Sequence, residues 1–229
     1  MIHALWSRAR RLRMKTLKPF GRGRDAGVVR LSLCDANEDV AAALAESFRD
    51  LDAVEVVVGD VLSLDADALV SPANSFGDMG GGVDKRIDDF YRGEAQRKLA
   101  GRIAGRWHGE IPVGSADVLA MSTRRFPFLI VAPTMRIPGR VDGTINAYLA
   151  FRAALIAVIE HNRRGEVAIA GLASTGVGTG VGAMTGDEAG RQMRAAYDMV
   201  VLEGWRRLAH PIQVPFAASR EYRPATGEC

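Results

Sequence analysis

The chain has few of the residues that build disulfide frameworks, metal centres or membrane spans. Cysteine occurs only as Cys34 and Cys229 in 229 residues, which excludes a disulfide framework and a zinc site of paired cysteines. Two cysteines without a pairing pattern are typical of the reducing cytoplasm, where we expect the protein. No apolar run approaches the roughly 20 residues of a membrane-spanning helix. The longest candidates, such as 126–132, have the length of a strand.

Positive charge is concentrated at the N-terminus. Residues 1–26 contain eight Arg or Lys and one acidic residue, Asp25, whereas the rest of the chain carries 22 basic and 26 acidic side chains. The overall charge of +3 therefore comes from this segment, and it is a weak argument for nucleic acid binding by the folded body. We expect a flexible, solvated tail, with an arm for nucleic acid or anionic membrane as the alternative.

The length and composition predict one soluble α/β domain with extensions. A hydrophobic content of 48% and a charged content of 25% are those of an ordinary globular protein. We assign 1–26 to the basic tail, 27–210 to the α/β domain and 211–229 to a C-terminal extension. The sequence does not predict an oligomeric state.

Predicted strands and helices alternate along the domain. The strands are short and almost continuously apolar, which is typical of a parallel sheet covered on both faces. This order predicts a three-layer α/β/α sandwich around a mixed, mostly parallel sheet. The predicted strands are 28–34, 54–58, 68–70, 116–121, 128–132 and 167–172, and the predicted helices are 37–50, with Asn37 as its cap, 83–103, 144–162 and 187–208.

Two glycine-rich loops follow predicted strands and precede predicted helices. One contains Gly80, Gly81 and Gly82, and the other spans 174–182. Backbone N–H groups at such positions bind phosphate, and two loops together suit a diphosphate. Either loop alone is better explained as a tight turn, whereas two loops at equivalent positions favour a ligand. Neither ends in the Gly-Lys-Ser/Thr of a P-loop, and the first predicted strand carries no glycine fingerprint of a dinucleotide-binding unit.

Four separated motifs resemble those of macro domains, which bind ADP-ribose. They are Gly59-Asp60-Val61, the stretch 67–75 that ends in Pro72-Ala73-Asn74-Ser75, the glycine run closed by Val83-Asp84, and the stretch 172–178. The resemblance covers roughly residues 28–209 in the family's order, and it extends to a bacterial and phage-associated subgroup. It implies the α/β/α fold predicted above and a ligand site at the two loops.

The resemblance also implies a role for individual residues. The Asp60 carboxylate accepts a hydrogen bond from the adenine amino group, beside the Val61 N–H, although a simple turn residue is the alternative. Asn74 holds the distal ribose. The first loop supplies the N–H groups of Gly81, Gly82 and Val83, and the second closes over the phosphates through Ser174, Thr175, Gly176, Val177 and Gly178.

Hydrolysis of ADP-ribose esters is a further implication of the resemblance. In some macro domains the Asp after the glycine run activates a water, which places Asp84 and Asn74 as candidate catalytic residues. Asp84 is equally explained as a first-turn carboxylate facing the helix dipole. Ser71, Met79 and Asp88 depart from the family pattern, which leaves enzyme activity open.

The sequence therefore predicts a protein that binds ADP-ribose, or a related adenine nucleotide derivative, either free or on an ADP-ribosylated substrate. The alternative is a non-catalytic assembly or virion-associated protein with the same fold. No cofactor is implied, and no metal site, because His108, His161 and His210 are scattered without ligand spacing. Nucleic acid is not the expected partner.

Overall fold

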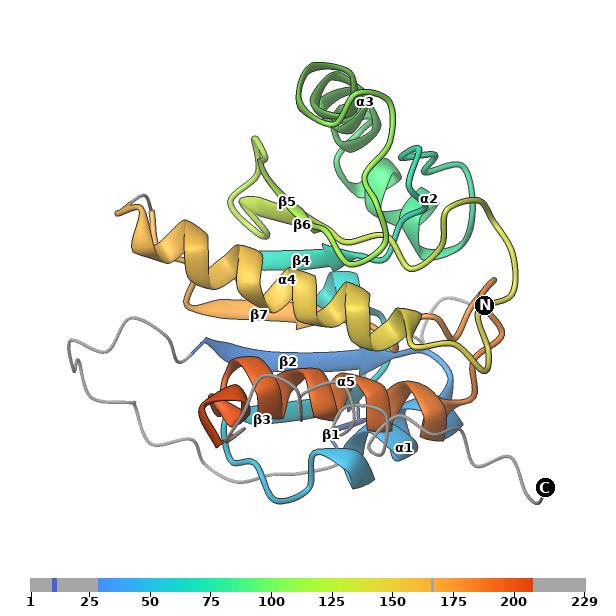
Figure 1. Cartoon of the computed structure of the whole chain (residues 1–229), viewed down its shortest axis with the longest axis vertical. Coiled ribbons are helices and arrows are strands. Elements are labelled where there is room, and N and C mark those ends of the chain that lie inside the picture. The colour runs from blue at the N-terminus through green and yellow to red at the C-terminus, as the bar shows by residue number, and fades with distance from the viewer. Residues whose placement is uncertain (1–9, 12–28, 166, 208–229) are drawn as a thin grey trace, which may run out of the picture.

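A computed structural model describes residues 10, 11, 29–165 and 167–207 (Figure 1). Its centre is a seven-stranded sheet in the order β1-β3-β2-β7-β4-β6-β5. The five inner strands run parallel, whereas β1 and β5 pair antiparallel at the two edges. The strands are β1 (Arg10–Arg11), β2 (Arg30–Asp35), β3 (Val54–Val58), β4 (Ala68–Ser71), β5 (Asp117–Ala120), β6 (Phe128–Val131) and β7 (Gly171–Ser174).

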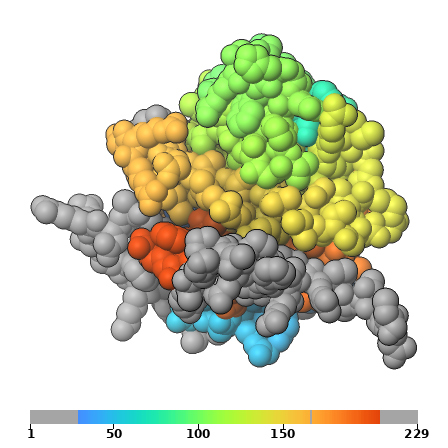
Figure 2. All heavy atoms as spheres, in the orientation of Figure 1, coloured from blue at the N-terminus to red at the C-terminus, as the bar shows by residue number. Residues whose placement is uncertain are grey.

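Helices cover both faces of the sheet, so the predicted three-layer α/β/α sandwich with a mostly parallel sheet is confirmed. One layer consists of α1 (Glu38–Ser47), α4 (Asn146–Arg163) and α5 (Gly186–Val200), which share a core with alternate residues of β2, β3, β4 and β6. The other consists of α2 (Gly82–Phe90) and α3 (Glu94–Arg106), which pack on the opposite side chains of the same sheet. In the space-filling view, α3 stands above α4 as a raised mass (Figure 2).

Local signals explain where several helices begin and end. The Asn37 side chain accepts from the Asp39 N–H at 2.9 Å and caps α1, as predicted. Thr185 caps α5 in the same way through the Glu188 N–H. After α4 the chain turns at Gly165, whose φ of 74° is the left-handed conformation that favours glycine.

The prediction of a single helix over 83–103 is wrong, because the helix is interrupted between Phe90 and Glu94. Arg92 and Gly93 adopt positive φ values of 55° and 79°, which end α2 and start α3 in a new direction. The Asp88 carboxylate then accepts from the Gln96 N–H at 2.8 Å across the break. Both helices can therefore press an apolar face onto the same side of the sheet.

Two further boundaries differ from the prediction. The strand predicted at 167–172 begins only at Gly171, because the Asp67 carboxylate takes the N–H groups of Ala170 and Gly171, each at 2.8 Å. The helix predicted at 187–208 ends at Val200. Glu203 has a φ of 51°, and the 3-10 turn η2 (Gly204–Arg207) follows.

The predicted extensions lie mostly outside the described residues. Of the basic segment 1–26, only Arg10 and Arg11 are described, and they form β1 against Val58 and Val57 of β3. The C-terminal extension 211–229 is not described. Over the described ranges, no helix has both the length and the hydrophobicity that crossing a bilayer demands.

Candidate functional site

The topology opens a cleft at the carboxyl edge of the sheet. β4 and β7 are parallel neighbours whose arrowheads point to the same side (Figure 1). The chain leaves β4 toward α2 on one face and leaves β7 toward α5 on the other. Ligands bind in open α/β sheets at such a divergence. A cleft of about 700 Å³ lies there, lined by both glycine-rich loops and by residues that follow β2, β3 and β6.

The first loop presents unpaired N–H groups at the start of α2. Gly81 precedes the helix without a side-chain cap, and Gly82 has a φ of 57°. Within the described part of the chain, the N–H groups of residues 81–84 donate no hydrogen bond. All four residues line the cleft. A helix start of this kind is a ready-made site for an anion.

The second loop presents a similar set of donors. The N–H groups of residues 178–182 also lack acceptors among the described residues, and all except that of Thr179 belong to Gly or Val. The loop is held in shape by hydrogen bonds from Met184 N–H to Gly178 O at 3.1 Å and from Val141 N–H to Gly182 O at 2.8 Å. A Cβ on Gly182 would collide with the Gly178 carbonyl oxygen. These five residues line the same cleft.

The side chains in the cleft add little positive charge. Among the described residues that line it, the charged ones are Asp35, Asp78, Asp84 and Arg86. The Asp35 carboxylate accepts from the N–H groups of Asn37 at 2.9 Å and Gly176 at 3.1 Å, so it is a structural clamp between β2 and the second loop. The anion-binding capacity of the cleft therefore rests on backbone donors rather than on lysine or arginine.

Asp84 is a half-buried carboxyl group in the first turn of α2. Burial raises its pKa from the ordinary 3.8 to about 6, and the nearby Asp78 adds to the rise. Ser71, which is fully buried at the end of β4, donates its hydroxyl to Asp84 Oδ1 at 2.6 Å and partly offsets that rise. The cleft thus holds a fixed carboxyl group that titrates close to neutral pH.

Asn74 lines the cleft, but its amide is already engaged by the loop that follows. Its Oδ1 accepts from Phe76 N–H at 3.0 Å and Asp78 N–H at 3.3 Å, and its Nδ2 donates to Asp78 O at 3.0 Å. Asn74 is only 7% exposed. In this structure it organises the loop, and its predicted contact with a ribose or with reacting groups stays a prediction.

Asp60 does not line the cleft, although Gly59 and Val61 on either side of it do. Its Oδ1 caps the 3-10 turn η1 (Val61–Ser63) by accepting from the Leu62 N–H at 3.0 Å. Its Oδ2 forms an ion pair with Arg86, which is one of the residues that line the cleft. The turn role that the sequence left open is therefore present, and the adenine contact stays a prediction.

The remaining predicted residues divide into two groups. Gly81, Gly82, Val83, Thr175, Gly176 and Gly178 line the cleft. Ser174 and Val177 do not. Ser174 is fully buried and donates to Thr175 O at 3.0 Å, and the Val177 N–H points to Met193 Sδ at 3.4 Å inside the core.

The departures from the family pattern have structural explanations. Met79, which interrupts the glycine run, is 2% exposed and packs in the core under α2 and α3. Its N–H donates to Gln96 Oε1 at 2.9 Å, and Gln96 also holds Gly77 O at 2.8 Å. Asp88 accepts from the Gln96 N–H and does not line the cleft. Gln96 of α3 thus fixes the first loop through two hydrogen bonds to its backbone.

Sequence reasoning missed Arg86, Thr134 and Thr179, which also line the cleft. Thr134 follows β6, the next parallel strand beyond β4, so the rule that ligands gather at carboxyl ends of strands was the available signal. Thr179 lies inside the predicted second loop. Nothing in the sequence pattern indicated Arg86, because its position depends on a partner 26 residues away.

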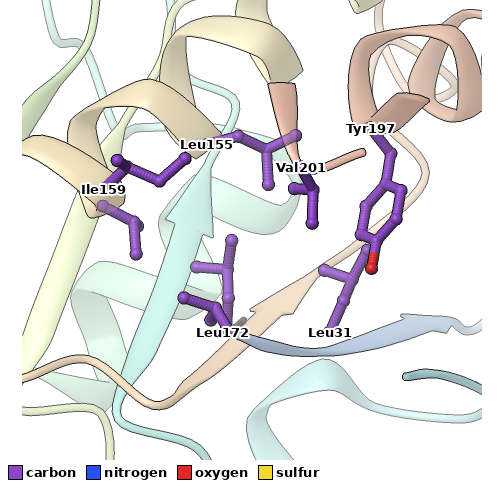
Figure 3. A pocket seen from close by; sticks show the side chains of 8 residues that line it. Leu31, Leu155, Ile159, Leu172, Tyr197 and Val201 are labelled. Carbon is purple, nitrogen blue, oxygen red and sulfur yellow. The ribbon is translucent and has the colours of Figure 1, made fainter. Parts of the chain in front are cut away.

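A second, much smaller gap lies on the α4 and α5 side of the sheet. Leu31, Leu155, Leu172 and Tyr197 converge on it from β2, α4, β7 and α5 (Figure 3). Its volume of about 10 Å³ corresponds to roughly one water molecule, and its lining is apolar. It is a packing gap, not a ligand site. No group of three or more His, Cys, Asp or Glu in the described ranges is arranged to hold a metal ion.

Comparisons with solved structures identify the fold. The macrodomain of Mycobacterium tuberculosis DarG matches with a TM-score of 0.51 and 21% identity, over 62% of this chain and 88% of that one. Thermosipho africanus DarTG in complex with ADP-ribose matches with a TM-score of 0.52 and 15% identity, over 72% of this chain and 50% of that one.

This chain has the macrodomain fold. No protein-family model matches it. An uncharacterized protein of Aquifex aeolicus is 34% identical over 140 residues, which is 61% of this chain and 78% of the relative. An uncharacterized protein of Aeropyrum pernix is 32% identical over 157 residues, which is 66% of this chain and 74% of the relative. The chain belongs to one family with these two proteins.

Proposed function

We propose that this macrodomain binds ADP-ribose, free or attached to a substrate. One observation carries the proposal: two runs of N–H groups that have no acceptor among the described residues, at 81–84 and 178–182, line a single cleft. The volume of about 700 Å³ lies in the range of small-molecule sites. A protein of the same fold is in complex with ADP-ribose, which supports the choice of ligand.

The diphosphate is the part of the ligand that this arrangement suits best. Phosphate oxygens only accept hydrogen bonds, and both loops present runs of backbone N–H donors. With the diphosphate between the loops, the two ribose units extend to opposite ends of the cleft. Val61 and Arg86 stand at the end that follows β3, and Asn74 and Thr134 follow β4 and β6. We assign the adenosine to the first end and the distal ribose to the second.

Isothermal titration with ADP-ribose tests the proposal on the parent protein and on Gly81→Glu. Gly81 has a φ of −140°, and a Cβ there meets no atom within 4 Å, so the variant folds and places a carboxylate among the phosphate donors. We expect heat from the parent and none from Gly81→Glu. Gly105→Glu on α3 is the matched control, because it is equally open but far along the chain from either loop. Parent protein that gives no heat refutes the proposal.

Hydrolysis of ADP-ribose esters is a second proposed activity, favoured by the state of Asp84. A carboxyl group whose pKa is about 6 is a stronger base than an ordinary aspartate and still deprotonates at neutral pH. The Ser71 hydroxyl fixes its orientation at 2.6 Å. Release of ADP-ribose from a protein modified on acidic side chains measures the activity. Asp84→Asn is expected to abolish release while ADP-ribose still binds, and unchanged release in that variant excludes the role.

A further inference from the structure

One corner of the molecule collects positive charge that the net charge of the folded body hides. The segments 90–98 and 120–127 together contain five basic residues and one acidic residue, whereas the remainder of 27–229 contains 17 basic and 25 acidic residues. Summing the two signs over the whole domain conceals this separation. The five residues that form this basic corner are Arg92, Arg97, Lys98, Arg124 and Arg125.

Hydrogen bonds join the two segments of the basic corner. The segments are the junction of α2 and α3 and the turn between β5 and β6. The Tyr91 hydroxyl donates to Phe126 O at 2.8 Å, and the Ser122 hydroxyl donates to Glu94 Oε1 at 2.7 Å. Lys98 pairs with Glu94 at 2.7 Å and neutralises the one acidic group. The four arginines are therefore left without a compensating carboxylate on these segments.

Three of the four arginines have no partner among the described residues. Arg92, Arg97 and Arg124 are exposed, and no acceptor in the described part of the chain contacts their side chains. By contrast, Arg49 and Arg206, which are also exposed, each pair with a glutamate three residues earlier. The corner thus holds guanidinium groups with unused donors, and such donors suit an external anion.

The fourth arginine is fixed by an aromatic ring. The Cζ atom of Arg125 lies 5.1 Å from the centroid of the Phe90 ring, and that ring packs edge to face on Phe126 with 6.0 Å between centroids. A guanidinium held by its face keeps the N–H groups at its edge for other acceptors. Because the guanidinium covers the Phe90 ring, that face of the ring is not a platform for stacking a base. The corner therefore offers contacts to phosphate rather than to bases.

The basic corner lies at the opposite edge of the sheet from the cleft. The Phe126 N–H donates to Ala66 O at 3.2 Å, and Phe128 pairs with Ala68, so the turn stands at the amino ends of β4 and β6. The cleft opens at the carboxyl ends, toward which the arrowhead of β4 points (Figure 1). None of the five basic residues lines the cleft. A partner held at the corner leaves the cleft open to its own ligand.

We propose that the basic corner docks the phosphate backbone of a nucleic acid. Guanidinium groups bind phosphate through paired N–H donors, and contacts to the backbone give affinity with little dependence on sequence. An anionic membrane fits less well, because surface binding to lipid combines charge with inserted apolar side chains. The exposed large hydrophobic residues of the described ranges all lie outside 90–98 and 120–127. The inference does not depend on binding of ADP-ribose.

Fluorescence anisotropy with a labelled DNA duplex of about 20 base pairs tests the inference on the full chain, between about 0.05 M and about 0.15 M salt. Arg97→Gln/Arg124→Gln removes two cations that contact no described acceptor, so we expect it to fold. Its affinity for the duplex is expected to be about tenfold lower at the lower salt, and its plot of log affinity against log salt is expected to be shallower by about 2. Arg49→Gln/Arg206→Gln is the matched control, since it removes the same charge from exposed positions elsewhere, and it is expected to bind like the parent.

The inference is wrong if the parent does not bind the duplex at the lower salt, or if both double variants lose affinity equally. Unchanged affinity and salt dependence in Arg97→Gln/Arg124→Gln also overturn it, since the binding then belongs elsewhere, for example to the basic segment 1–26. So does a loss of binding to vesicles with about one-third anionic lipid while duplex binding is retained, which makes the corner a membrane surface. Thermal unfolding verifies the fold. If the double variant is unfolded, Arg124→Gln decides the question, with half the expected change in slope.

Titration with ADP-ribose separates this inference from the proposed function. Arg97→Gln/Arg124→Gln is expected to give the same heat as the parent, because the corner and the cleft lie at opposite edges of the sheet. Failure of ADP-ribose binding refutes the proposed function alone, and failure of duplex binding refutes this inference alone.

Discussion

Replacing Asp84 by Asn is expected to stabilise the protein, and the gain is expected to depend on pH. The Asp84 carboxyl group has a pKa of about 6 in the folded protein against an ordinary value of 3.8. Between these values the folded state binds more protons than the unfolded state, so stability falls as pH rises through this window. At about 1.4 kcal/mol for each pH unit, the burial of the charge costs at most about 3 kcal/mol above pH 6.

Asn carries no charge, and its Oδ1 still accepts from the Ser71 hydroxyl. The cost is therefore removed without loss of the hydrogen bond that now measures 2.6 Å. Urea unfolding of parent and Asp84→Asn at about pH 4 and about pH 7.5 measures the difference. We expect the advantage of the variant to grow by about 2–3 kcal/mol between these two pH values. An advantage that is the same at both, or that shrinks as pH rises, refutes the assignment of a raised pKa to Asp84.

Three further substitutions test the account of the site and of the fold. Ser71→Ala removes the hydroxyl that lowers the Asp84 pKa, so carboxyl ¹³C NMR of the variant is expected to find that pKa above about 6. An Asp84 pKa in the variant that is lower than in the parent contradicts the role of the hydrogen bond. Gly176→Ala places a Cβ 2.6 Å from Val40 Cγ1 and is expected to lower the free energy of unfolding, measured by thermal unfolding, by about 1–3 kcal/mol. Gly81→Ala is the control, because a Cβ at Gly81 meets no atom within 4 Å, and it is expected to leave stability unchanged. Equal effects at the two sites contradict the packing difference. Asp117→Ala removes a buried carboxylate that accepts from Trp107 Nε1 at 2.8 Å and is paired with Arg106. It is expected to lower the free energy of unfolding by about 3 kcal/mol, and denaturant curves that coincide with the parent's reject this.

The three-layer arrangement and the two glycine-rich loops could be predicted from the sequence, because both depend on local composition. Strands buried on both faces are almost entirely apolar, as are 128–131, 68–71 apart from Ser71, and 54–58 apart from Glu55. Glycine clusters between a strand and a helix marked the places where the backbone lines the cleft. Helix caps such as Asn37 are equally local, since the side chain bonds within three residues.

The errors arose where a distant residue decides the local structure. Gly93 breaks the helix, yet Gly101 and Gly105 remain helical in α3, so the presence of glycine did not indicate which position would turn. The start of β7 depends on Asp67, which is 103 residues from Ala170. The environment of Asp60 likewise depends on Arg86, and a motif that covers three residues carries no information about such a partner.

The most direct test of the central claim is a ¹H–¹⁵N NMR titration of the full chain with ADP-ribose. The account predicts that the largest amide shift changes occur at 81–84 and 178–182, because these N–H groups, which have no acceptor among the described residues, gain phosphate acceptors. Shift changes confined to one of the two runs, or centred on the gap beside Leu155 and Tyr197, would contradict it.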